Sequence, residues 1–366
     1  MVKDHRANDI FDPSDPGKRV TARLFVDASE TGRLVRLSGH HVGTVGREDQ
    51  NPDQLQMAAT LMFKMKGIDA RAGVVDYRLQ GRLMSDKGSF QLWAGHEMNV
   101  HPSFIRYNED SAHFKLKPYN AGEDGYSGLG VERSKEIEYW MNMLLIYNVD
   151  ARKAIKDIGS DRYPQDGDGI DPETARRLAI EEIKRPEFIA LLRQLRGLES
   201  AELVMENGEP VVGEILYLRE SIHTADVADR ENRIYRFALD KEGVTGGDAK
   251  YYAHRIGLGY YPFDSNSYKK GEPLSNPLAQ NPWYIPYEVL LHPRLTNVLI
   301  PGYAANMDSF AWTAMRVYPN LIVLGDAAGV AAGLALQGKF RIHGPSEQQI
   351  ALLQQTLVAY KAILDK

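Results

Sequence analysis

The sequence predicts an α/β protein in which both ends of the chain form one parallel-sheet domain and the middle forms an inserted α+β domain. Two short apolar runs near the C-terminus, residues 297–302 and 320–325, each end in glycine. Continuous apolar runs are typical of strands buried on both faces of a parallel sheet. The middle of the chain instead alternates apolar and polar residues, as antiparallel strands do. We therefore assign residues 1–50 and 291–366 to the first domain and 51–290 to the second.

The run at 320–325 leads directly into Asp326-Ala-Ala-Gly-Val-Ala-Ala-Gly333, and we expect a helix to begin near Asp326. The unpaired N–H groups and positive dipole end of such a helix would favour a phosphate. Gly325, Gly329 and Gly333 recur at a spacing of four, and the last two would share a face that permits close approach. The alternative is a tightly packed strand–helix crossing with Asp326 as an ordinary cap.

Composition limits the class of protein. At 366 residues, with 43% hydrophobic and 25% charged residues, the chain has an ordinary globular composition and can hold two domains. By sequence we expect no apolar run long enough to cross a bilayer, and residues 1–6 lack a signal-peptide core, so we expect a cytoplasmic location. A net charge of -5 predicts no general attraction to nucleic acid or anionic membranes. Because cysteine is absent, redox chemistry would require a bound organic cofactor.

The two ends of the chain show simple patterns. Turn-forming residues at 12–18 precede an expected strand at 20–26, which alternates and then becomes apolar. That strand runs into Asp27, and a short helix near Arg33 to Leu37 should follow. At the other end, the apolar face of residues 346–364 predicts an ordinary packing helix.

The middle of the chain contains both helix and strand patterns. An apolar stripe predicts a helix within residues 134–147. A second helix is expected to begin at Asp171-Pro172, with aspartate as the cap and proline in the first turn, and Pro186 should interrupt it. The stripe consists of Ile137, Trp140, Met141, Leu144 and Leu145. The expected strands of this part are 56–64, 74–83, 90–93 and 213–218.

Two polar segments suggest metal binding, but neither is expected to hold a metal. The loop at 161–171 carries three aspartates, yet an EF-hand aligned on Gly169 would put Pro164 and Ala175 at ligand positions. His96 and His101 lie five residues apart, a poor spacing for ligation from a strand or a helix. We therefore predict no metal site.

The segment Met315 to Gly333, with its Gly-Asp-Ala-Ala-Gly sequence, resembles the C-terminal flavin-binding motif of FAD-dependent oxidoreductases of glutathione-reductase-like fold. Further stretches at 25–32 with 45–48, at 218–220 and at 284–287 follow in the family's order. The resemblance extends from about residue 19 to the C-terminus. It implies a partial glutathione-reductase-like FAD-binding domain with an inserted α+β substrate domain, and FAD as the cofactor.

The resemblance also implies which residues bind the cofactor. The carboxylate of Asp326 would hold the ribityl chain, and the backbone of Ala327, Ala328 and Gly329 would face the pyrophosphate. The remaining residues expected at the cofactor are Asp27, Ala28, Ser29, Gly32, Arg47, Gly302 and Gly325.

The first glycine motif of such a domain is missing. A complete FAD domain of this type opens with a strand, G-x-G-x-x-G and a helix, whereas the glycines at 167–169 and 246–247 follow no strand. The chain thus resembles only the later two-thirds of a family member. We expect a second chain to complete the sheet, and a lone monomer to hold FAD weakly.

Flavin chemistry needs no nucleophile from the protein, since the side chains orient the substrate and accept a proton. Arg219 and Glu220 match an Arg-Glu pair that the family has after the strand behind the active site. Aromatic residues at 260–262 and 283 would suit a pocket, although aromatics at this density are usually core. The candidate catalytic residues are Arg219, Glu220, His223, Tyr287 and Arg316.

The predicted function is an FAD-dependent oxidoreductase polypeptide that transfers hydride from a small organic substrate to flavin. The alternative is a flavin-free relative that acts as a structural or binding subunit. The missing G-x-G-x-x-G motif favours the alternative, whereas Gly325, Asp326 and Gly329 favour the enzyme.

Overall fold

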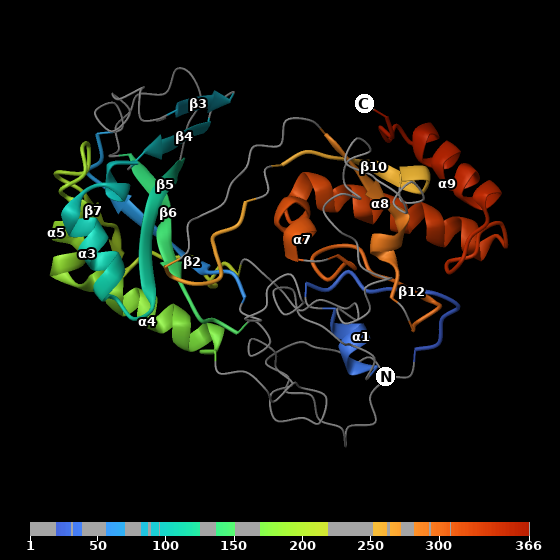
Figure 1. Cartoon of the computed structure of the whole chain (residues 1–366), viewed down its shortest axis with the longest axis horizontal. Coiled ribbons are helices and arrows are strands. Elements are labelled where there is room, and N and C mark those ends of the chain that lie inside the picture. Colours follow the sequence, from blue (N-terminus) through green and yellow to red (C-terminus); the bar gives the residue numbers. More distant parts are fainter. Residues whose placement is uncertain are drawn as a thin grey trace.

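Two separate hydrophobic cores organise the chain, one around an antiparallel sheet and one around a long helix. Figure 1 shows them side by side, with the sheet at the left and the helix at the right. A computed structural model describes residues 20–30, 32–38, 56–69, 82–86, 89–94, 96–124, 137–150, 169–218, 252–261, 264–271, 282–292, 294–307 and 309–365.

The first core lies on a six-stranded sheet with the strand order β3-β4-β5-β6-β2-β7. All neighbouring strands in this sheet are antiparallel. The strands are β2 (Ala59–Lys66), β3 (Arg82–Asp86), β4 (Ser89–Ala94), β5 (Phe114–Asp124), β6 (Glu138–Ile146) and β7 (Glu202–Leu203). A short hairpin of β8 (Met205–Glu206) and β9 (Glu209–Pro210) follows. The strands expected at 56–64 and 90–93 are confirmed as β2 and β4, whereas residues 74–81 of another expected strand lie outside the described residues.

Helices cover this sheet on the side that faces away from the second core (Figure 1). They are η2 (His96–Asn99), α3 (Pro102–Asp110), α4 (Pro172–Lys184) and α5 (Pro186–Leu192). The predicted helix start at Asp171 is confirmed, because the Asp171 carboxylate accepts a hydrogen bond from the Thr174 N–H at 2.9 Å. The predicted interruption at Pro186 is also confirmed, since α4 ends and α5 begins there.

The predicted helix at 134–147 is wrong, because residues 138–146 form strand β6. The stripe that suggested a helix belongs to an almost continuous apolar run. Tyr139, Met141 and Met143 are buried and alternate with more accessible residues, which is the period of a strand. A central strand of this kind is apolar on both faces, so its residues also fit a helical spacing. The expected strand at 213–218 is likewise wrong, since Tyr217 makes only an isolated bridge with Thr60.

The two ends of the chain meet in a short parallel pair. Strand β1 (Phe25–Val26) pairs in parallel with β12 (Val298–Leu299), and α1 (Arg33–Leu37) follows β1. The predicted short helix is therefore confirmed, and the strands expected at 20–26 and 297–302 are present but shorter than expected. Val35 packs with Val298 and Ile300 in a small hydrophobic cluster that joins these elements.

The second core surrounds α8 (Tyr318–Leu336). Around it lie β10 (Arg255–Gly259), antiparallel to β11 (Trp283–Pro286), and the helices η7 (Tyr287–Leu290), α7 (Ser309–Met315) and α9 (Glu347–Ala359). Strand β10 approaches α8 closely at Gly257, where a Cβ atom would lie 2.4 Å from Cγ1 of Val323. The predicted closing helix is confirmed as α9, which begins with a capping box at Ser346 and buries Ile350, Leu353 and Leu357.

The predicted strand at 320–325 is wrong, because these residues form the first turns of α8. Pro319 stands in the first turn, and buried residues recur at helical spacing from Asn320 through Leu324 and Ala327. Periodicity alone cannot tell whether a short apolar run is a buried strand or a buried segment of a helix. The expected helix start at Asp326 is therefore also wrong, and the phosphate site predicted from it is lost because N–H groups inside a helix bond to the preceding turn.

Helix α8 is also long and apolar enough to cross a membrane by length and composition. Its mean hydropathy is 1.5, and 33% of the 18-residue window is buried. The expectation that no segment reaches this length is thus corrected. Core helices meet the same criterion, and Leu324, Ala327, Ala328 and Ala331 of α8 are core residues here.

A linking segment, residues 264–271, joins the two cores. The Lys117 ammonium donates to the Asn266 side chain at 3.4 Å, and the Tyr147 hydroxyl donates to the Asn266 carbonyl at 3.2 Å. Both partners stand on the antiparallel sheet or at its edge. The first residue of the segment, Asp264, bonds to the helical side of the molecule, as described below. The boundaries of the two predicted domains stay a prediction, although β10 and β11 pack in the core of α8.

Substitution of Gly257 by alanine should destabilise the protein by about 1–3 kcal/mol, because the new methyl group overlaps the stiff side chain of Val323. Urea denaturation measures the difference. The control is Gly271→Ala, where an added Cβ meets no atom within 4 Å. Equal urea concentrations at the unfolding midpoints of Gly257→Ala and the wild type would contradict the tight packing.

Substitution of Asp171 by alanine should lower the free energy of unfolding by about 1 kcal/mol near neutral pH. Burial acts to raise the pKa of Asp171, but hydrogen bonds from Thr174 outweigh it and lower the pKa below its usual value. The carboxylate therefore stabilises α4 above its unfolded pKa, and this stabilisation is lost as the pH falls through the folded pKa. Denaturation at a series of pH values should show that the difference in unfolding free energy between the wild type and Asp171→Ala shrinks in acid. The Asp171→Asn protein should lack the part of the pH dependence that the carboxylate causes.

Candidate functional site

A buried arginine lies between the two cores. Arg316 follows α7, and its side chain is only 2% exposed. Its Nη1 donates to the Tyr217 hydroxyl at 2.7 Å, and its Nη2 donates to Oδ2 of Asp264 at 2.7 Å. Tyr217 is held on the antiparallel sheet, because its backbone exchanges two 2.9 Å hydrogen bonds with Thr60. The arginine thus brings together α7, the linking segment and the edge of the sheet.

Aromatic rings surround the guanidinium. Its Cζ lies 5.9 Å from the ring centre of Tyr217, 6.0 Å from that of Tyr261 and 5.8 Å from that of Trp312. These distances suit cation–π attraction. Burial by itself lowers the pKa of Arg316, but Tyr217, Asp264 and Tyr261 outweigh it and raise the pKa, so the group stays charged. We call Tyr217, Tyr261, Asp264, Tyr303, Trp312 and Arg316 the Arg316 cluster.

One donor of the cluster has no acceptor. The Nε–H of Arg316 is buried and makes no hydrogen bond with the described residues. A buried polar group left unpaired is unusual and costs about 1–3 kcal/mol, more when charged. An acceptor on a bound molecule would remove this penalty.

The cluster lies at the carboxyl ends of β1 and β12. Tyr303 follows Gly302, which comes shortly after β12 and has a φ of 99°. The pKa of Tyr303 is raised by its burial first, and then by Tyr217, Tyr318 and Glu30. Because Glu30 follows β1, residues after both parallel strands approach the cluster. Ligands of open α/β sheets bind at this edge.

The turn after β1 is fastened by Asp27 and Ser29. Asp27 is 4% exposed, and its Oδ1 accepts hydrogen bonds from the N–H of Ser29 at 3.2 Å and from its hydroxyl at 2.5 Å. Its Oδ2 accepts from the Val35 N–H at 3.0 Å, and Ser29 Oγ accepts from the Arg33 N–H at 2.6 Å. These bonds tie β1 to α1, so both side chains have a structural role whether or not they contact a cofactor.

The predicted site residues are spread over several places. Arg316 and Gly302 lie at the Arg316 cluster or next to it, and Asp27, Ala28, Ser29 and Gly32 lie in the turn after β1. Arg47, Arg219, Glu220 and His223 fall outside the described residues. As residues that bind cofactor or substrate, all of these stay predictions.

The remaining predicted residues lie in the second core. Tyr287 is fully buried and donates its hydroxyl proton to the Ile342 carbonyl at 3.0 Å. Burial and then Glu288 raise its pKa, so it keeps that proton. On α8, Ala327 and Ala328 face the core, while Gly325, Asp326 and Gly329 are exposed. Any cofactor contact of this helix would have to use the exposed face.

Sequence reasoning missed Tyr217, Asp264, Tyr303 and Trp312. No motif connects these residues, because each belongs to a different segment and only the folded chain gathers them. Tyr303 carried the one usable signal, since it directly follows the expected strand-end glycine Gly302. Tyr261 was included in the aromatic stretch at 260–262, whereas Trp283 of that prediction is core.

The cluster suits an organic ligand with hydrogen-bond acceptors. It offers a buried N–H without a partner, a permanent positive charge and aromatic walls. The flavin ring carries nitrogen and oxygen acceptors on a flat apolar body, so these residues fit it. Among the described residues, no three His, Asp or Glu side chains are grouped so that they could hold a metal ion.

Comparison with known proteins identifies the family. The family model of FAD dependent oxidoreductases matches residues 3–357. No curated protein and no solved structure matches the chain significantly. The match covers almost the whole chain. The chain therefore belongs to the FAD-dependent oxidoreductase family, which implies FAD as its cofactor.

Proposed function

We propose that this polypeptide removes a hydride from a small organic substrate and that the reaction takes place beside the Arg316 cluster. The observation that carries the proposal is the buried, permanently charged Arg316 with an unpartnered Nε–H at the carboxyl ends of β1 and β12. In an open α/β sheet this edge is the usual place of a ligand. A preformed charged donor in a site of low polarity also stabilises negative charge that develops during a reaction.

When bound, FAD supplies the hydride acceptor. Arg316 would hold an acceptor atom of the flavin ring through its Nε–H and stabilise negative charge there. Asp264 positions Arg316, because the 2.7 Å ion pair fixes the guanidinium plane. Tyr261 and Trp312 form walls that exclude water, which strengthens these interactions. The raised pKa of Tyr303 keeps its phenol protonated.

We further infer a glutathione-reductase-like arrangement, in which residues 1–50 and 291–366 hold the flavin and residues 51–290 hold the substrate. A second chain would complete the parallel sheet. What supports this is the small size of the parallel pair and the exposure of Val20 and Val26, at 52% and 46%, beside it. Unpaired strand edges with apolar side chains are covered in stable proteins. A cytoplasmic location stays a prediction.

One observation favours the alternative of a flavin-free structural subunit. The backbone N–H groups of residues 326–329, expected at the pyrophosphate, lie inside α8 and are used by the helix. The cofactor phosphates would then need other donors. Flavin content distinguishes the two functions.

The purified chain should therefore acquire flavin absorbance in the visible range when FAD is added, alone or together with its co-purifying partner. Gel filtration with absorbance detection measures FAD and protein in the same peak. A colourless protein peak under both conditions would contradict the oxidoreductase function and support the structural subunit.

Substitution of Arg316 by lysine should weaken FAD binding by a factor of about ten or more, because a charge-assisted hydrogen bond contributes about 1.5–3 kcal/mol. Lysine keeps the charge beside Asp264 but lacks the Nε–H and the planar fork. Quenching of flavin fluorescence gives the dissociation constant.

The matched control is Arg255→Lys, because Arg255 also pairs with a carboxylate, at 2.9 Å from Asp365, but outside the cluster. Equal FAD affinities for the Arg316→Lys, Arg255→Lys and wild-type proteins would show that Arg316 does not contact the flavin. Lysine is preferred to alanine, since removing one partner of a buried ion pair destabilises a protein by about 3–5 kcal/mol.

A further inference from the structure

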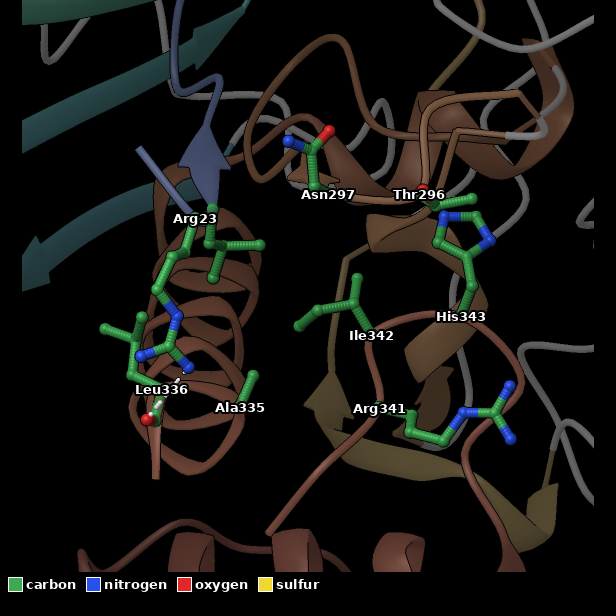
Figure 2. Close-up of a pocket in the computed structure, with 9 residues that line it drawn as sticks. Arg23, Thr296, Asn297, Ala335, Leu336, Arg341, Ile342 and His343 are labelled. Carbon is green, nitrogen blue, oxygen red and sulfur yellow. Dashed lines mark hydrogen bonds between the residues drawn. The ribbon is translucent and has the colours of Figure 1, made fainter. Parts of the chain in front are cut away.

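A cavity lies at the amino ends of β1 and β12, opposite the edge that carries the Arg316 cluster. Arg23 and Leu24 line it just before β1 begins, and Thr296 and Asn297 line it just before β12 begins. The other walls are the last turn of α8 and the residues up to His343. The cavity has a volume of about 360 Å³ (Figure 2), which is within the range of small-molecule sites.

Each polar side chain that lines this cavity can donate a hydrogen bond. Arg23, Thr296, Asn297, Arg341 and His343 line it, and no acidic residue of the described ranges does. Arg23 donates a hydrogen bond from Nη2 to the Leu336 carbonyl at 3.1 Å. This bond, drawn in Figure 2, holds Arg23 against the end of α8 and leaves its other donors available. The whole chain carries a net charge of -5, so a cavity with two arginines and no carboxylate differs from the average surface.

Within the part of the chain that the structure describes, the two arginines are not paired with carboxylates. Neither Arg23 nor Arg341 makes an ion pair with any described residue. Arg341 is exposed, and Figure 2 shows its guanidinium turned away from Arg23. Because nothing in the described chain fixes this long side chain, it can turn toward a bound anion. Guanidinium groups recognise phosphate and carboxylate oxygens through paired donors.

His343 contributes a buried polar atom. Its Nε2 is inaccessible to solvent and has no hydrogen-bond partner among the described residues. Burial lowers the pKa of the imidazole, although the Leu295 backbone acts to raise it. The ring lies beside Thr296 at the cavity (Figure 2), but its Nε2 is enclosed by the protein and is not open to a ligand. Leu24, Ala335, Leu336 and Ile342 supply an apolar surface next to it.

We propose that this cavity is a second binding site, which takes a small organic oxyanion, either a phosphate or a carboxylate, carried on an apolar body. The donors of Arg23, Arg341 and Asn297 recognise the oxyanion, and the apolar wall contacts the remainder of the ligand. The site is distinct from the flavin site, because flavins and other ligands of parallel sheets bind at the carboxyl ends of the strands. Helix α8 extends from the Arg316 cluster at its start to this cavity at its end.

The test is calorimetric titration of the full chain, in the form in which it is purified, at constant ionic strength. The probes are phenyl phosphate and benzoate, which share an apolar ring and differ in the oxyanion, and phenol, which has no charge. At least one anion should bind, and phenol should not. The tighter of the two anions identifies the ligand class.

Variants locate the binding. Arg341→Gln and Arg23→Gln should each lower the affinity for the anion by about tenfold or more, since each removes a charged donor. Arg341→Gln alone decides the test if Arg23→Gln does not fold, because Arg341 is exposed and no described residue pairs with it. The matched control is Arg196→Gln, an exposed arginine near the antiparallel sheet. Saturating FAD should leave the anion affinity unchanged.

Three results would overturn the proposal. The first is that neither anion binds the wild-type chain. The second is that Arg196→Gln weakens binding as much as Arg341→Gln does, which would indicate attraction to surface charge in general. The third is that FAD abolishes anion binding, which would place the probe in the flavin site.

Discussion

The ion pair of Arg316 and Asp264 is the interaction on which the arrangement of the two cores depends. Two charges leave water to form it, and such a pair stabilises a protein little by itself. Its effect is on specificity, since a misplaced partner would leave a buried charge uncompensated. Asp264 opens the linking segment that Tyr147 and Lys117 hold on the sheet. The correct pairing of one arginine therefore fixes how the sheet side meets the α8 side.

The same pairing creates the site. Tyr217 comes from the sheet side and Trp312 from the helical side, and the guanidinium between them touches both. Neither core alone contains the whole Arg316 cluster. A site at the junction of two bodies can enclose a cofactor on one side and a substrate on the other, as flavin chemistry requires.

The parallel pair of β1 and β12 separates two different environments. Its carboxyl edge carries aromatic rings and a paired arginine, whereas its amino edge carries Arg23 and Arg341 without carboxylates. Helix α8 borders both, with about 27 Å between its ends at 1.5 Å per residue. One helix thus borders both the Arg316 cluster and the cavity at the amino edge, whose polar groups differ.

The sequence by itself determined the family and the elements with strong local signals. The cap at Asp171 and the break at Pro186 followed from residue chemistry, and the strand β2 followed from the strand character of residues 56–64. Only the tertiary structure decided that 138–146 is a strand and that 320–325 is helical, because a short apolar run satisfies both periods and its packing partners choose between them. The tertiary structure also decided the Arg316 cluster, since its members come from distant segments and no spacing along the chain links them.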